Sequence, residues 1–201
     1  MASQRHSVTR VDDDLLLDAA RHCVLSVGVR RTTLTDIARR AGTSRMTVYR
    51  RFPGVTSVVA ALMTREFGAL LAEVAEVVDG AESARERLVA AAVRAVVRLA
   101  GDPLLTSVLD RDAELLLPYL VERVGSTQRL AEAFIIEQLT TGHADGSIRP
   151  APVAAQARVF FLTVQAIVLA HRPAGSDVLL AELAASLDHS LRPDNTNGTA
   201  S

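Results

Sequence analysis

Residues 33–52 read TLTDIARRAGTSRMTVYRRF, and this stretch decides the fold of the N-terminal part of the chain. Its apolar positions predict two short helices, Thr35 to Ala41 and Arg45 to Phe52, because those of each helix fall on one face. Gly42 allows the tight turn between them, and Ser44 can cap the second helix by accepting a hydrogen bond from an amide two or three residues later. Cationic, hydroxyl and flexible side chains remain on the outer face: Arg45, Met46, Thr47, Tyr49, Arg50 and Arg51. Such a surface suits a DNA major groove.

The order and spacing of ten of these residues resemble the helix-turn-helix of the TetR family of bacterial transcriptional regulators: Thr33, Ile37, Ala38, Ala41, Gly42, Ser44, Thr47, Val48, Tyr49 and Phe52. Beyond this stretch the chain is similar to the family only in length and helical layout. The resemblance implies an all-α protein of about nine helices, with an N-terminal three-helix DNA-binding domain and a helical ligand-binding and dimerisation domain. One position departs from the pattern. Many members carry a lysine three residues after the motif's Phe, and Val55 stands there, so one expected phosphate anchor is missing.

The resemblance also implies which side chains meet DNA. Base edges would be read from the start and outer face of the second helix, by Arg45, Met46, Thr47 and Arg50. Arginine pairs bidentately with guanine, whereas methyl groups of Thr47 and Met46 can touch thymine methyls. The phosphate backbone would be contacted by Thr33, Thr35, Tyr49 and Arg51. Such contacts fix the register of the protein on DNA without reading sequence.

The distribution of charge supports a DNA-binding end. Residues 1–54 hold ten Arg and five Asp, a net charge of +5, whereas residues 55–201 hold twelve Arg and eighteen acidic residues, a net charge of −6. A basic segment of this kind is expected to face phosphate. The alternative is an arginine-rich corner of an ordinary helical bundle. It would not explain why the positive charge is concentrated in the N-terminal segment.

The chain is expected to divide into a DNA-binding domain at residues 1–54, an effector-binding and dimerisation domain at 55–192, and a disordered tail at 193–201. Residues 1–11 are expected to form a mobile arm whose Arg5 and Arg10 reach phosphates or an adjacent minor groove, with a plain disordered terminus as the alternative. A first helix then runs from the aspartates at 12–14 to about Val27. Hydrophobic periodicity predicts further helices at 55–78, 84–100, 103–109, 119–142 with a break near 125–127, 159–170 and 177–191.

The second domain is expected to bind an apolar or amphipathic small molecule, since no glycine-rich phosphate loop occurs. Binding would tilt the helix at 55–78 and release the DNA, provided that the ligand prefers one of two states. The candidate lining consists of apolar residues and three polar ones: Phe67, Leu71, Val96, Leu105, Leu109, Phe134 and Phe161, with Tyr119, Gln138 and Gln165. Each of these residues could equally be plain core. A DNA-binding dimer without any effector is the alternative.

A homodimer is expected because almost every residue between Val159 and Ala170 is apolar, and such a helix must be covered on all sides. This helix and the one at 177–191 would form a four-helix interface with a second copy. The expected interface residues are Phe160, Val164, Ile167, Val168, Leu180, Leu183 and Leu187. Two recognition helices about 34–36 Å apart would then meet a near-palindromic operator. Alternatively, the helix at 159–170 is the central helix of a monomeric bundle.

Other classes of protein find little support in the sequence. The five histidines lie far apart without metal-ligand spacing, and no Gly-x-Ser-x-Gly nucleophile motif occurs, so we expect no enzyme, metal or cofactor. An all-helical enzyme or carrier is the competing class.

Cys23, the sole cysteine, excludes an internal disulfide and is expected to be a buried small residue. We expect a cytoplasmic protein without a membrane span, since no signal peptide opens the chain and the run at 159–170 is short. Members of the TetR family usually repress transcription, so the resemblance implies a repressor.

Overall fold

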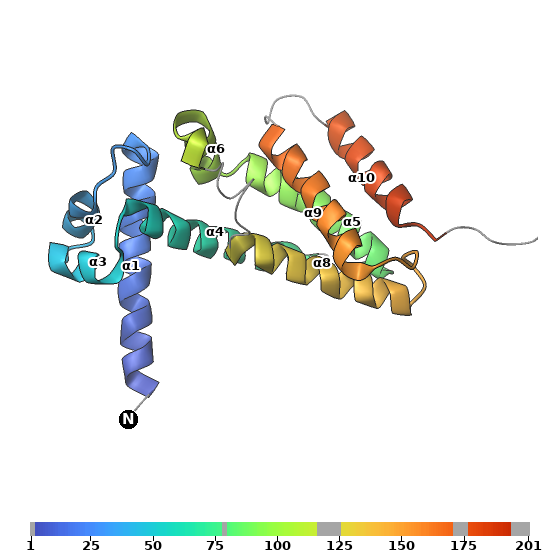
Figure 1. Cartoon of the computed structure of the whole chain (residues 1–201), viewed down its shortest axis with the longest axis horizontal. Coiled ribbons are helices and arrows are strands. Elements are labelled where there is room, and N and C mark those ends of the chain that lie inside the picture. Colours follow the sequence, from blue (N-terminus) through green and yellow to red (C-terminus); the bar gives the residue numbers. More distant parts are fainter. Residues whose placement is uncertain (1–2, 78–79, 116–125, 171–176, 194–201) are drawn as a thin grey trace, which may run out of the picture. The chain divides into compact units, whose positions relative to one another are not determined.

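The computed structural model describes residues 3–77, 80–115, 126–170 and 177–193. Within these ranges all regular structure is helical, with nine α-helices and one short 3-10 helix (Figure 1). The expected all-α fold is therefore confirmed. The chain forms two compact units, which are described separately below. Unit 1 comprises residues 1–68 and 102–125, and unit 2 comprises residues 69–101 and 126–201.

Unit 1 contains the helix-turn-helix and an element from much later in the chain. Its helices are α1 (Ser3–Val27), α2 (Leu34–Arg40), α3 (Arg45–Arg51), the first part of α4 (Val55–Val77), α6 (Pro103–Arg111) and the 3-10 helix η1 (Ala113–Leu115). α1 contacts α2, α2 contacts α3, and α6 contacts α1. The side chains of Ile37, Val48 and Leu62 are completely buried in the core that these helices share.

The position of α6 differs from the sequence-based division of the chain. The sequence placed residues 103–109 in the second domain because the boundary was drawn at residue 54. In the structure, Leu104 and Val108 of α6 are buried in the core of unit 1. Asp102 caps α6 as expected, and its side chain accepts a hydrogen bond of 2.8 Å from the amide of Leu105. The apolar face of α6 thus completes the N-terminal unit.

The first helix begins earlier than expected. The sequence suggested a mobile arm over residues 1–11 and a helix start at the aspartates 12–14, because acids favour the first turn of a helix. α1 instead begins at Ser3, and residues 12–14 lie in its interior. No glycine or proline occurs before Gly28, so nothing in the sequence stops the helix from extending toward the N-terminus. The arm is therefore helical from Ser3 onward.

Unit 2 is a helical bundle built around α5 (Ala84–Ala100). α5 contacts α8 (Ser126–Ala144), α9 (Val153–Ala170) and α10 (Asp177–Leu191), and α8 contacts α9. The last part of α4 also belongs to this unit. Ser83 caps α5 by accepting a hydrogen bond from the amide of Glu86. The bounds of α5 and α10 are those that the sequence predicted.

Gly142 does not end α8, although the sequence suggested that it would. The helix continues to Ala144, and Gly146, with a φ of +74°, lies in the turn that follows. Gly142 serves packing instead. A Cβ atom at this position would lie 2.3 Å from Cδ1 of Ile148, which is buried. The glycine therefore allows the loop after α8 to pack closely on the helix.

Two helices are long and apolar enough to cross a bilayer by length and composition: residues Val55–Glu76 of α4 and Val153–Ala170 of α9. The sequence-based estimate considered only residues 159–170, whereas α9 begins earlier. Both helices pack within the chain. α4 buries Val58 and Leu62 in the core of unit 1, and α9 contacts α5 and α8. In addition, Arg65 and Glu66 stand in the middle of α4, where charge would be costly in lipid.

Candidate nucleic-acid interface

Hydrogen bonds at both helix starts fix the helix-turn-helix. The side chain of Thr33 caps α2 by accepting a bond of 3.1 Å from the amide of Asp36. Gly42 adopts a φ of +65° in the turn, as its place in the sequence required. Ser44 caps α3, and its hydroxyl accepts a bond of 3.1 Å from the amide of Thr47. The structure confirms this expected cap, which holds the first turn of α3 in place.

The outer face of α3 carries most of the side chains that the sequence assigned to base reading. Arg45 and Arg50 are exposed, and Met46 is 76% exposed although it is apolar. Thr47 is half-buried, and its hydroxyl lies 2.9 Å from that of Ser44. Among the described residues, no acidic side chain pairs with Arg45 or Arg50. Both guanidiniums are therefore available for a ligand outside the chain.

The residues assigned to phosphates differ in their availability. Tyr49 is 54% exposed on α3, so its hydroxyl can reach a ligand. Thr35 is half-buried in the first turn of α2. The hydroxyl of Thr33 donates a bond of 2.5 Å to the carboxylate of Asp36 in addition to its role as a cap. Arg51 is partly buried and pairs with Asp13 of α1. Sequence analysis missed this partner because it lies on another helix.

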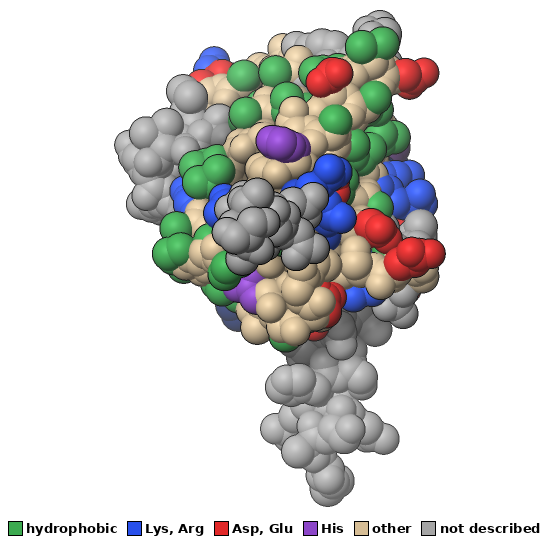
Figure 2. Space-filling view, turned by 90° about the vertical axis from the view of Figure 1, so that its right-hand side faces the viewer, with side chains coloured by type: hydrophobic (Ala, Val, Ile, Leu, Met, Phe, Trp, Pro, Cys, Tyr) green, Lys and Arg blue, Asp and Glu red, His purple; other side chains and the backbone are tan. Residues whose placement is uncertain are grey.

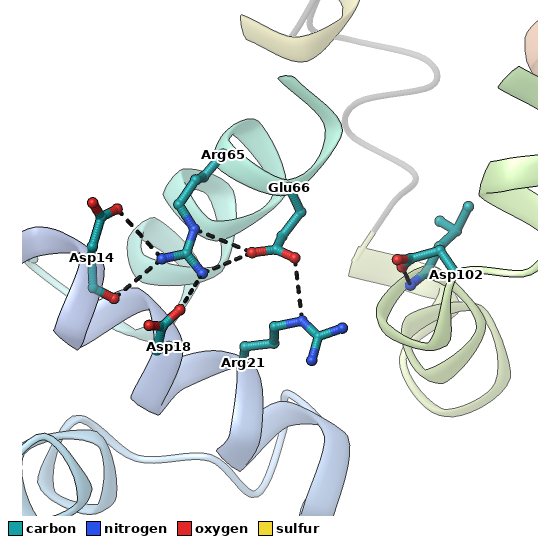
Figure 3. A network of polar contacts seen from close by, with 7 residues as sticks. Asp14, Asp18, Arg21, Arg65, Glu66 and Asp102 are labelled. Atoms are coloured by element: carbon teal, nitrogen blue, oxygen red, sulfur yellow. Dashed lines mark hydrogen bonds and ion pairs between the residues drawn. The ribbon is translucent and has the colours of Figure 1, made fainter. Parts of the chain in front are cut away.

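Ion pairs neutralise the acidic side of α1. Figure 3 shows Arg65 of α4 between two carboxylates of α1, at 2.7 Å from Asp18 and 3.5 Å from Asp14. Arg65 also lies 2.7 Å from the neighbouring Glu66, which in turn accepts a bond of 3.2 Å from Arg21. Burial opposes the shift, but the hydrogen bonds that Arg65 donates to Glu66 and Asp18 raise its pKa. Carboxylates that would repel a phosphate backbone are thus paired with cations of the same unit.

Two other titratable groups of unit 1, Asp36 and Cys23, make contacts within the unit. The Thr33 hydroxyl, which donates to Asp36, holds the pKa of that carboxyl below its usual value, and Arg39 adds to the effect. Burial raises the pKa of the Cys23 thiol, and Cys23 packs against the core of the unit. Cys23 is only partly buried, whereas the sequence suggested a buried position. Among the described residues, no group of three or more His, Cys, Asp or Glu side chains could hold a metal ion.

The candidate effector residues are divided between the two units. Phe67, Leu105 and Leu109 belong to unit 1, and Tyr119 lies outside the described residues. The other six belong to unit 2: Leu71, Val96, Phe134, Gln138, Phe161 and Gln165. In unit 2, Phe134 packs against Val74 and Ala91, and Gln138 accepts a bond of 3.2 Å from Arg87. Val96 is completely buried.

Most of the expected dimer residues face the interior of unit 2. Phe160, Val168, Leu183 and Leu187 are buried, and Val164, Ile167 and Leu180 are half-buried. The exposed apolar residues of α9 and α10 are their neighbours: Val159, Leu162, Val178 and Leu179. Sequence analysis missed this face because α9 is apolar all round and its pattern gives no direction. In Figure 2, apolar side chains reach the surface at several places among acidic and basic ones.

A capped helix-turn-helix with exposed arginines on its second helix defines a DNA-binding protein of the helix-turn-helix class. The family model described as "Bacterial regulatory proteins, tetR family" matches residues 16–62. HTH-type transcriptional regulators of Mycobacterium bovis and Mycobacterium tuberculosis, both named as uncharacterized, are 38% identical to this chain over 176 residues, which cover 88% of this chain and 90% of each relative. The chain therefore belongs to the TetR family of transcriptional regulators and is not an enzyme.

Solved structures of lower identity share the fold. Bacillus subtilis FadR in complex with stearoyl-CoA is 19% identical, with a TM-score of 0.65 over 89% of this chain and 98% of that one. RolR in complex with resorcinol is 15% identical, with a TM-score of 0.70 over 96% and 92%. The ketosteroid regulator KstR2 of Mycobacterium tuberculosis is 21% identical, with a TM-score of 0.57 over 90% and 95%. These likenesses agree with the all-α architecture.

Proposed function

We propose that this protein is a ligand-responsive repressor that binds a near-palindromic operator as a homodimer in the bacterial cytoplasm. The observation that carries the proposal is the exposed face of α3, where Arg45 and Arg50 have no acidic partner among the described residues. Both guanidiniums can reach guanine in a major groove, and Met46 can touch a thymine methyl. Tyr49, Arg51 and the start of α2, with Thr33 and Thr35, contact phosphates.

Arg51 has two tasks in this proposal. Its pairing with Asp13 orients the side chain at the end of α3, and its positive charge attracts the phosphate backbone. Arg50 is exposed and makes no such pair in the described residues. We therefore assign Arg50 to base reading and Arg51 to the DNA backbone.

Selection of bound duplexes from a random DNA pool tests the DNA-binding part and gives the operator sequence. With that duplex, Arg50→Ala should relax the preference at one base pair, which corresponds to about 1–3 kcal/mol of discrimination. Arg51→Ala should weaken binding to all sequences alike and reduce the salt slope by about 1. Arg98→Ala, which removes a half-exposed arginine of α5 in unit 2, is the control and should bind as the unchanged protein does. Interchanged results for Arg50 and Arg51 would overturn the assignment.

The homodimer is supported by exposed apolar residues on α9 and α10. Val159 is 67% exposed and Val178 is 78% exposed, and Leu162 follows Val159 on the same face of α9. We propose that a second copy covers these residues, while the buried Phe160 and Val168 support them from behind. Val159→Glu should produce a monomer in sedimentation experiments and weaken operator binding. Val97→Glu places the same charge at an exposed valine of α5 and should leave the dimer intact.

The effector is proposed to be an apolar or amphipathic small molecule. Two structural relatives are described in complex with such compounds, FadR with stearoyl-CoA and RolR with resorcinol. In this chain, Phe134 and Phe161 offer apolar contacts, and Gln138 and Gln165 offer polar ones. A thermal-shift screen with fatty acyl and phenolic compounds tests the idea, because a ligand of the folded state raises the melting temperature. A positive compound should also release the operator duplex. If no compound does so, the alternative of a dimer without an effector is favoured.

The direction of regulation is testable in a reporter strain that carries the selected operator downstream of a promoter. Repression predicts lower reporter output when the protein is produced, and recovery of output when an effector is added. Arg50→Ala, which should recognise the operator poorly, is the matched control. Higher output with the unchanged protein would identify an activator.

A further inference from the structure

Asp112 is a buried carboxylate that reaches from the end of α6 to the turn before the helix-turn-helix. Only 2% of the residue is exposed. Its own amide donates a bond of 2.9 Å to the carbonyl of Val108, so the residue is fixed to the last turn of α6. Its Oδ2 accepts a bond of 2.7 Å from the amide of Val29, and its Oδ1 lies 3.4 Å from the amide of Arg30. Nε of Arg30 lies 3.7 Å from the same Oδ1.

These contacts make the carboxylate and the turn dependent on each other. A buried charge is tolerated only where donors face it, and the donors here are two successive amides and one guanidinium from the turn. Gly28 allows the Asp112 carboxylate to approach the turn closely. Its φ is +81°, and a Cβ atom would lie 3.0 Å from Oδ2 of Asp112. The conformation of the turn thus presents its amides to the carboxylate and leaves room for it.

The same turn leads directly into α2. The hydroxyl of Thr32, a buried residue, donates a bond of 2.7 Å to the carbonyl of Gly28, and its amide donates to the carbonyl of Val29 at 3.1 Å. The next residue, Thr33, is the cap of α2. Residues 28–33 therefore form one hydrogen-bonded segment, with the Asp112 carboxylate at one end and the first turn of α2 at the other. A change at Asp112 would loosen the support of α2 and of α3, which packs on α2.

We propose that Asp112 is a positioning residue for DNA binding. Its carboxylate holds the turn at residues 28–33 and thereby sets where the helix-turn-helix lies on α1. The inference rests on the proposed DNA-contact face of α3, to which Asp112 does not belong. Two further contacts between these segments lie at the surface. Glu114 pairs with Arg30, and Arg111 approaches the carbonyl of Leu25 at 3.4 Å. Exposed pairs contribute little to stability.

The sign of the expected effect separates positioning from simple electrostatics. Removing a negative charge near the DNA-binding unit should strengthen DNA binding if only long-range attraction mattered. Positioning predicts the opposite for Asp112→Ala, because fewer molecules then hold α2 and α3 in the binding-competent arrangement, and the apparent Kd rises as that fraction falls. Asp112→Asn removes the same charge but keeps an oxygen that can accept from Val29. The comparison of the two variants therefore isolates the hydrogen bond.

The experiment measures the Kd of the full chain for the selected operator duplex, at a temperature where denaturation curves show each variant to be folded. We expect Asp112→Ala to weaken binding about tenfold, with unchanged base preference and salt slope. Asp112→Asn should recover most of this loss, and Glu114→Gln, which removes a surface partner of Arg30, should bind as the unchanged protein does. Amide hydrogen exchange should show faster exchange at Val29 in Asp112→Ala. If this variant does not fold, Asp112→Glu replaces it, because the longer side chain keeps the charge but displaces the carboxylate, and it should weaken binding as well.

Three results would overturn the proposal. The first is a folded Asp112→Ala protein that binds the operator as tightly as the unchanged protein or more tightly. The second is an equal loss of affinity in Asp112→Asn and Asp112→Ala. The third is a changed salt slope, which would indicate a lost phosphate contact. Failure of the DNA-contact face is distinguishable from these results, because the unchanged protein would then show no preference for any duplex.

Discussion

The two units of this protein differ in what they leave on their surfaces. Among the described residues of unit 1, the most exposed large apolar residue is Met46 on α3, where Arg45 and Arg50 have no acidic partner, and Asp13, Asp14 and Asp18 of α1 pair with Arg51 and Arg65. In unit 2 large apolar residues are exposed on α5, α8, α9 and α10, with Val159 and Val178 among them. The first surface is suited to an anion and the second to another apolar surface.

This difference indicates how each unit is specified. The position and orientation of α3 in unit 1 depend on directional contacts, such as the Ser44 cap and the Asp112 carboxylate. Such contacts are needed because base reading tolerates little displacement of the helix. The packing of unit 2 depends mainly on burial of apolar area, which has no direction. Substitutions in the core of either unit should therefore lower the free energy of unfolding. Removal of a single polar contact should weaken DNA binding when the contact lies in unit 1, but not when it lies in unit 2.

The largest expected effect follows from the core of unit 1. Ile37→Ala removes a completely buried side chain of α2 and should lower the free energy of unfolding by about 2–5 kcal/mol. Val159→Ala removes a mostly exposed side chain of α9 and should change it by less than about 0.5 kcal/mol when the chain is monomeric. Urea denaturation followed by circular dichroism measures both. A similar loss for the two variants would contradict the exposed position of Val159.

A smaller effect is expected where α8 and the following loop approach each other in unit 2. Gly142→Ala should force Ile148 aside at a cost of about 1–3 kcal/mol, offset in part by the better helix propensity of Ala, about 1 kcal/mol. The free energy of unfolding of the double variant with Ile148→Ala is the decisive measurement. Because Ile148→Ala removes the side-chain atoms nearest to Gly142, the two changes should together cost less than their sum. Strict additivity would show that the close approach is absent.

Two helix caps of the same chemistry distinguish the units directly. Ser44→Ala at α3 and Ser83→Ala at α5 each remove a hydroxyl that accepts a hydrogen bond from an amide three residues later, and each should cost about 1 kcal/mol of stability. Only Ser44→Ala should weaken operator binding, because α3 carries the contact face. Denaturation curves and fluorescence anisotropy with the operator duplex give the two quantities. Equal binding losses would mean that a cap acts through overall stability alone.

The smallest effect concerns pH. Hydrogen bonds from Thr33 and Ser147 lower the pKa of Asp36 in unit 1 and of Asp145 in unit 2. A carboxyl whose pKa is lower in the folded state contributes stability above its unfolded value of about 3.9, and this contribution is lost as the pH falls through the folded pKa. Asp36→Asn and Asp145→Asn should therefore each flatten the decline of stability below pH 4. A decline as steep as in the unchanged protein would show that these carboxyls contribute nothing.

The sequence predicted those elements whose signals are local. The start of α3 at Arg45 and its Ser44 cap were predicted, because a cap contacts an amide only three residues away. The bounds of α5 and α10 were predicted as well, since both have apolar stripes and clear ends. The start of α1 was placed too late, because acids at residues 12–14 are compatible with the interior of a helix as well as with its first turn. Gly142 was taken for a helix end, because a glycine needed for close packing looks the same in a sequence.

The sequence by itself determined the helix-turn-helix, the order of the helices and the excess of positive charge at the N-terminal end, because these depend on neighbours within a few turns of one chain. Tertiary structure decided three other features. It placed α6 in the core of unit 1, joined Asp112 to the amide of Val29 across 83 residues of chain, and left Val159 rather than Phe160 on the surface of α9. An apolar helix has no preferred face and a lone carboxylate no partner until distant segments pack together, so neither outcome is encoded in local periodicity.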